Sequence, residues 1–120
     1  MDIKELRIGS LIKWKSTGDL DYVVKIDITI KNVCVNNVNI EDCEAVPLAE
    51  EWLLKLGFKK YIGWDDMDFW CLPDEGGKSD RFELYVTNQG FESPSGKIIE
   101  YVHTLQNCYF FHELSGKELL

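Results

Sequence analysis

Alternating apolar and polar residues mark the clearest predicted strand of the chain, which covers residues 22–31. One side of this stretch is apolar and mostly β-branched: Tyr22, Val24, Ile26, Ile28 and Ile30. A period of two with β-branched side chains is typical of a strand that buries one side. We therefore expect a long strand here, with these five side chains in the core.

Shorter apolar stretches near this strand predict further strands at residues 11–15, 33–35 and 38–40. Residues 16–19 (Ser-Thr-Gly-Asp) supply the side chains that favour a hairpin loop. Asn36 and Asn37 tolerate the backbone of a tight turn between the last two strands. Four or five antiparallel strands within about 40 residues predict a small, strongly curled sheet, for which an SH3-like arrangement is one option.

A central helix is predicted over residues 48–56. Glu50 and Glu51 would lie in its first turn, where carboxylates complement the helix dipole. Gly57 suits the position just past the helix end. Ala49 at the N-cap has no side-chain oxygen, so we expect this helix to begin without a side-chain cap.

The second half of the chain returns to strands and ends in another helix. Strands are predicted at residues 67–72 and 82–87, a final strand or the approach to the helix at residues 97–100, and the helix at residues 101–113. No repeat, low-complexity segment or linker interrupts the sequence. We therefore predict a single α+β domain over residues 1–120, with the curled sheet first, then the central helix, further antiparallel strands and the C-terminal helix.

The charge balance narrows the class of partner. The chain has 120 residues, 13 of them Lys or Arg and 21 Asp or Glu, which gives a net charge of −8. Like charges oppose non-specific binding to nucleic acid or to an anionic membrane. Unbroken apolar runs reach only four residues, so we expect no membrane partner.

The sequence gives little indication of catalysis, of a cofactor or of a metal. Its four cysteines form no Cys-x-x-Cys pair, and we expect free thiols in a reducing cytoplasm. Cys108, His112 and His103 have helical spacing but no fourth ligand, so no metal site is predicted. Glycine-rich phosphate loops and recognised catalytic motifs are missing from the sequence.

Polar residues of the C-terminal helix are the main candidates for a binding site. A helical wheel places one group of residues on the core face: Tyr101, Val102, Leu105, Cys108 and Tyr109. The opposite face carries His103, Gln106, Asn107 and Phe110. Donors, acceptors and an aromatic ring on one face suit a ligand or a partner, whereas the alternative is a solvated helix face whose polar residues bond neighbouring loops.

Four further residues complete the candidate ligand-binding set: Trp64, Trp70, Arg81 and Tyr85. Tryptophan could stack on a base, and Trp64 lies among Gly and Asp residues where a loop would expose it. The alternative role for Trp64 is to cover a sheet edge. Arg81 could bind a phosphate, or it could pair with an acidic neighbour such as Asp80 or Glu83.

Three segments carry a family resemblance: residues 3–9 (IKELRIG), 46–58 (VPLAEEWLLKLGF) and 101–110 (YVHTLQNCYF). In this order they resemble small uncharacterised proteins of Bacteroides-type genomes and their phages. Threonine is usual there at the position of Ala49, a difference that affects only helix capping. The resemblance implies no activity; it implies a phage or mobile-element origin and a bacterial host cytoplasm.

Binding is therefore the leading functional hypothesis. We expect a non-enzymatic accessory protein that captures a small nucleotide-like ligand, acting as a sponge for a host immune signal. One alternative is an acidic inhibitor that binds a host protein by mimicking DNA. Another is an enzyme that cleaves a signalling nucleotide with His103 as general base, and a structural role in the virion is also open. A homo-oligomer is compatible with a small sheet that has an open edge.

Overall fold

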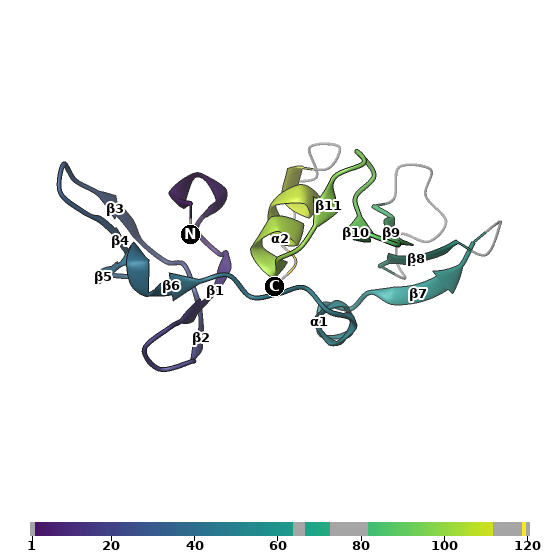
Figure 1. The fold of residues 1–120 in the computed structure, drawn as a ribbon, viewed down its shortest axis with the longest axis horizontal. Coiled ribbons are helices and arrows are strands. Elements are labelled where there is room, and N and C mark those ends of the chain that lie inside the picture. Colours follow the sequence, from purple (N-terminus) through teal and green to yellow (C-terminus); the bar gives the residue numbers. More distant parts are fainter. Residues whose placement is uncertain (1, 64–66, 73–81, 112–118, 120) are drawn as a thin grey trace.

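The structure, a computed structural model, describes residues 2–63, 67–72, 82–111 and 119. It is an α+β fold in which every strand pair is antiparallel, as the sequence predicted. Figure 1 shows an elongated molecule, with principal-axis extents of 51 × 27 × 22 Å. None of the described helices is long and apolar enough to cross a membrane.

The N-terminal half contains six short strands and two 3-10 turns. In chain order these are η1 (Ile3–Glu5), β1 (Leu11–Trp14), β2 (Leu20–Tyr22), β3 (Ile26–Ile28), β4 (Val33–Val35), β5 (Val38–Asn39), η2 (Ile40–Asp42) and β6 (Cys43–Glu44). The strands form two three-stranded sheets, ordered β2-β1-β6 and β3-β4-β5. The single curled sheet that the sequence predicted is thus divided into two.

The C-terminal half contains one larger sheet between two helices. Its elements are α1 (Glu50–Lys55), β7 (Lys59–Ile62), β8 (Asp68–Cys71), β9 (Leu84–Thr87), β10 (Gly90–Glu92), β11 (Ile98–Ile99) and α2 (Val102–Phe111). The sheet is a simple meander of order β11-β10-β9-β8-β7. Helix α2 follows β11 and lies between this sheet and the N-terminal strands (Figure 1).

The described residues form two hydrophobic cores. The main core joins α1, the five-stranded sheet and α2, and its fully buried members include Leu53, Leu84 and Leu105. The N-terminal core lies between the small sheets and includes Val23 and Val35. Leu11 of β1 is also a buried member of the main core, so this hydrophobic contact connects the halves together with the polar contacts described below.

Several local predictions are confirmed. Asn36 and Asn37 both have positive φ, 51° and 66°. A two-residue hairpin turn needs this backbone to match the right-handed twist of the strands that it joins. Helix α1 ends before Gly57, whose φ of 92° is strained for any residue with a side chain. Ala49 gives α1 no side-chain cap. The cysteines at positions 34, 43, 71 and 108 are free thiols.

The long strand predicted over residues 22–31 is wrong. The chain forms β2 and β3 there, in different sheets, with an interruption at residues 23–25. Val23 is fully buried, whereas Val24 is 70% exposed and Ile28 68% exposed. Most of the side that the alternation assigned to the core therefore faces outward.

The side chain of Asn36 explains the interruption. Its Oδ1 accepts hydrogen bonds from the backbone N–H of Val24 (2.8 Å) and of Lys25 (3.1 Å), and its Nδ2 donates to the carbonyl of Tyr22 (2.8 Å). These bonds satisfy backbone groups that a continuous strand would pair with a neighbouring strand. The chain can therefore leave one sheet and enter the other without unpaired polar groups.

The matched pair Val23→Ala and Val24→Ala tests this arrangement. Removing the buried Val23 side chain should lower the free energy of unfolding by about 1.5–3 kcal/mol, because burying a valine side chain on folding contributes about that much stability. Val24→Ala should change it by less than about 0.5 kcal/mol, as for other exposed sites. Urea denaturation of dilute protein measures both values. The reverse order would support the continuous strand instead.

Candidate functional site

The polar face of α2 is not solvated, because it binds the N-terminal segment. Gln106 is fully buried; its Oε1 accepts from the backbone N–H of Leu11 (2.7 Å) and its Nε2 donates to the carbonyl of Gly9 (2.9 Å). Asn107 Nδ2 donates to the carbonyl of Glu5 (2.7 Å). These two amides bond the neighbouring N-terminal segment, as the alternative of polar residues bonding nearby loops predicted, although the burial of Gln106 contradicts a solvated face. They join the two halves of the molecule.

Arg7 extends this contact. Its Nε donates to Asn107 Oδ1 (2.7 Å), and a guanidinium nitrogen donates to the carbonyl of Gln106 (3.3 Å). The guanidinium also lies over the ring of Phe110, 4.2 Å from the centroid, in cation–π geometry. We call Arg7, Gln106 and Asn107 the Gln106 cluster. Phe110, predicted as a stacking surface for a ligand, instead stacks under this arginine.

His103 differs from the other residues of this face. It is only 1% exposed, yet among the described residues Nδ1 has no hydrogen-bond partner, and the contact of Nε2 with Glu5 is too long or poorly aligned for a good hydrogen bond. Its Nε2 lies 3.5 Å from Glu5 Oε2, and its ring stacks on Tyr101 with centroids 5.8 Å apart. A buried polar group without a partner costs about 1–3 kcal/mol, so His103 is the unusual feature of this face.

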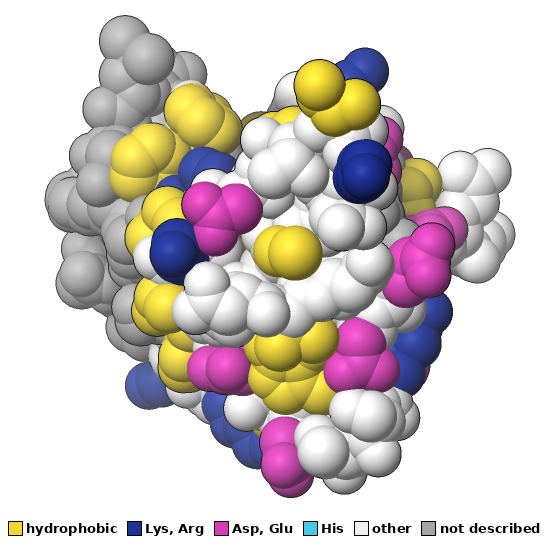
Figure 2. Space-filling model, turned by 90° about the vertical axis from the view of Figure 1, so that its left-hand side faces the viewer, with side chains coloured by type: hydrophobic (Ala, Val, Ile, Leu, Met, Phe, Trp, Pro, Cys, Tyr) yellow, Lys and Arg dark blue, Asp and Glu magenta, His cyan; other side chains and the backbone are white. Residues whose placement is uncertain are grey.

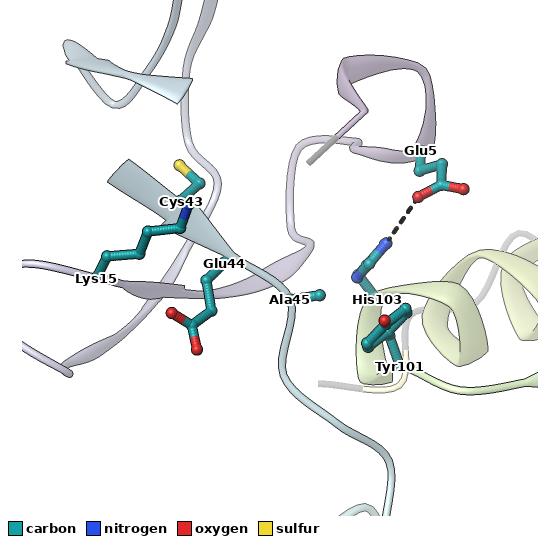
Figure 3. A pocket seen from close by; sticks show the side chains of 7 residues that line it. All are labelled: Glu5, Lys15, Cys43, Glu44, Ala45, Tyr101 and His103. Carbon is teal, nitrogen blue, oxygen red and sulfur yellow. Dashed lines mark ion pairs between the residues drawn. The ribbon is translucent and has the colours of Figure 1, made fainter. Parts of the chain in front are cut away.

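A cavity of about 240 Å³ opens beside His103. Figure 3 shows its lining side chains, which come from η1, the end of β1, β6 and the start of α2: Glu5, Lys15, Cys43, Glu44, Ala45, Tyr101 and His103. We call it the His103 cavity. It lies where the N-terminal strands meet α2, so it depends on the contact that the Gln106 cluster makes.

The electrostatics of the cavity favour neutral imidazole and a neutral thiol. Burial lowers the pKa of His103 from its ordinary value of 6.5, although the nearby Glu5 carboxylate partly offsets this. Burial, and then the charge of Asp42, raise the pKa of Cys43. The wall thus offers the donor and acceptor of a neutral ring, two carboxylates and one ammonium group, without an activated thiolate.

The other sequence candidates that the structure describes do not line this cavity. Trp70 is a buried member of the main core, and its indole nitrogen has no hydrogen-bond partner among the described residues. Tyr85 donates a hydrogen bond to Glu83 and lies against Phe69, with ring centroids 6.2 Å apart. The predictions for Trp64 and Arg81 lie outside the described residues. Among the predicted site residues that the structure describes, only His103 lines the cavity.

Sequence reasoning missed most of the cavity wall. Glu5, Lys15 and Glu44 carry no motif, and they meet only because β1 pairs with β6 and η1 contacts α2. Tyr101 was assigned to the core face of the helix, yet it is 37% exposed and lines the cavity. Its position directly before α2 was the only available signal. In the described part of the chain, no group of three or more His, Cys, Asp or Glu residues is placed to hold a metal ion.

Comparisons with protein-family models, with curated proteins and with solved structures give no match to this chain. The functional argument therefore depends on the geometry of the site.

Loss of the buried amide tests the structural role of the Gln106 cluster. Gln106→Leu should lower the free energy of unfolding by about 2–4 kcal/mol, because the carbonyl of Gly9 and the N–H of Leu11 lose their partner in a buried place. The same substitution in an exposed turn, Gln89→Leu, is the control and should have little effect. Equal urea midpoints for the two variants would contradict this role.

The lowered pKa of His103 predicts a pH effect on stability. As the pH falls through 6.5, the unfolded chain binds a proton at this residue before the folded chain does, so the free energy of unfolding decreases. Above 6.5 the contribution is complete. His103→Gln should flatten this slope between about pH 5 and pH 7. NMR titration of the His103 ring should give a midpoint below 6.5, and a midpoint above it would contradict the burial argument.

Proposed function

We propose that the protein is a non-enzymatic binder of a small molecule and that the ligand occupies the His103 cavity. One observation carries this proposal: among the described residues the buried ring of His103, in the wall of a cavity, has no hydrogen-bond partner at Nδ1 and only the 3.5 Å contact with Glu5 at Nε2. A ligand that hydrogen-bonds to this ring would remove a cost of about 1–3 kcal/mol. The same ligand would contact groups from both halves of the molecule.

The size and charge of the cavity favour one chemical class. A volume of 240 Å³ equals that of about eight water molecules in the liquid, somewhat less than a typical drug-sized site. Glu5 and Glu44 attract N–H groups and repel phosphates, and Lys15 offsets only one of these two charges. The ring of Tyr101 offers a stacking surface. These features suit a single planar nitrogen heterocycle, such as a nucleobase or the base of a nucleoside.

A nucleotide-like host signal would then bind through its base, with its phosphates outside the cavity. The resemblance to phage and mobile-element proteins supports a role in sequestering such a signal in the host. Cys43 is held as a thiol, which favours capture of the ligand over covalent chemistry at this cavity.

A thermal-shift screen with nucleobases, nucleosides, nucleotides and cyclic dinucleotides tests the ligand class. At about 100 times its dissociation constant a ligand adds about 2.7 kcal/mol of stability, which for this length raises Tm by about 10 °C. We expect the shift with a base or nucleoside, and a weaker shift with the corresponding 5′-phosphate. The ligand should be recovered chemically unchanged.

Variants of the cavity wall locate the site. Glu44→Gln and Tyr101→Ala should each reduce the ligand-induced shift while Tm without ligand changes little. Glu41→Gln is the matched control, because Glu41 is exposed in η2 and does not line the cavity. No shift with any compound would overturn the proposal and favour a protein partner. A shift that survives both cavity variants would place the ligand elsewhere.

A further inference from the structure

Strand β3 is an open edge of the small sheet β3-β4-β5. Its pairing with β4 uses alternate residues: the carbonyl of Lys25 accepts from Asn36 N–H, and the N–H of Thr29 donates to the carbonyl of Asn32, both at 2.8 Å. By the same alternation, the backbone N–H and C=O groups of Ile26 and Ile28 point away from β4. No described strand pairs with these groups, so they form an edge on which another strand could add.

The side chains along this edge are unusually apolar for a surface. Val24 is 70% exposed, Ile28 68% and Ile30 fully exposed, and they are the residues whose alternation predicted a buried strand. Figure 2 shows this end of the molecule, where apolar side chains lie among charged ones. An exposed edge strand with such side chains is a template for pairing between chains.

We infer that two copies of this chain pair through β3, antiparallel, about a two-fold axis at Ile26. Residues directly opposite in an antiparallel pair project on the same face of the sheet. Ile26 would then face Ile26 of the second copy, and Ile28 would lie near Val24, which precedes the strand and keeps its N–H bonded to Asn36. On the other face Lys25 would lie opposite Asp27, twice by symmetry. Apolar side chains thus meet apolar ones, and each ammonium group meets a carboxylate.

Charge complementarity selects this register over its neighbours. An axis at Asp27 would place two Asp27 carboxylates opposite each other, and an axis at Ile28 would place Lys25 opposite Lys31. Like charges directly opposite destabilise a strand pair. Residues 20–31 contain two acidic and two basic side chains, so this segment carries none of the chain's net charge of −8.

The five-stranded sheet lacks this complementarity at its β7 edge. Strand β7 is also an open edge, but it begins with Lys59 and Lys60, both exposed. Lysines on an edge strand oppose pairing with a second copy. The observations therefore favour β3 as the self-association surface. This dimer requires neither the His103 cavity nor its ligand.

A complementation experiment tests the register. Sedimentation equilibrium of the wild-type chain should show a dimer, whereas Lys25→Asp alone and Asp27→Lys alone should each be monomeric, because like charges would then face each other. An equimolar mixture of the two variants should form a heterodimer, since every Asp at position 25 or 27 of one chain then faces a Lys of the other. Lys59→Asp, on β7, is the matched control and should stay dimeric.

Two kinds of result would contradict the dimer or its register. A wild-type chain that remains monomeric up to about 1 mM, where even a weak complex of about −4 kcal/mol would be half formed, overturns the inference. Dimeric single variants, or a mixture that does not complement, would overturn the register at Ile26. Circular dichroism of each variant checks that the fold is retained, which the exposure of Lys25 predicts.

Discussion

The buried amide of Gln106 is the central polar contact between α2 and the N-terminal half, whose Leu11 also packs in the main core. It is fully buried, and it bonds to the backbone of Gly9 and Leu11, about a hundred positions earlier in the chain. Burying an amide costs free energy unless both its donor and its acceptor are satisfied, and here both are. The geometry of two backbone groups thus fixes the rotation of α2, which a hydrophobic contact alone would leave adjustable.

This rotation also places the candidate site. His103 lies one turn before Gln106, on the same face of α2, so fixing Gln106 directs His103 toward the N-terminal segment as well. The backbone there bonds to Gln106 and Asn107, whereas the His103 ring meets the Glu5 carboxylate and the ring of Tyr101. In the described part of the chain, Nδ1 of this ring therefore stays without a hydrogen-bond partner beside the cavity.

The sequence predicted what is decided locally. The positive φ of Asn36 and the missing side-chain cap of α1 at Ala49 depend on neighbouring residues, and both were predicted correctly. Polarity alone could not separate the buried Gln106 from a solvated residue, because its partners lie across the fold. Strand β7 was missed because consecutive lysines at its start hide the alternation. Most of the cavity wall could not be predicted from the sequence either, because the pairing of distant strands brings its residues together.

The incorrect prediction of a long strand over residues 22–31 still indicates which residues form an apolar side. A period of two reports that one side of a strand is apolar, but not which surface covers it. In one copy of the chain the Asn36 side chain turns the backbone away, and Val24 and Ile28 stay exposed. Natural sequences are consistent across levels except where function requires otherwise, so an apolar edge without a cover calls for a partner. In the dimer that we propose, a second copy would supply that cover with the same alternation and with matching charges, which would reconcile the sequence pattern with the structure.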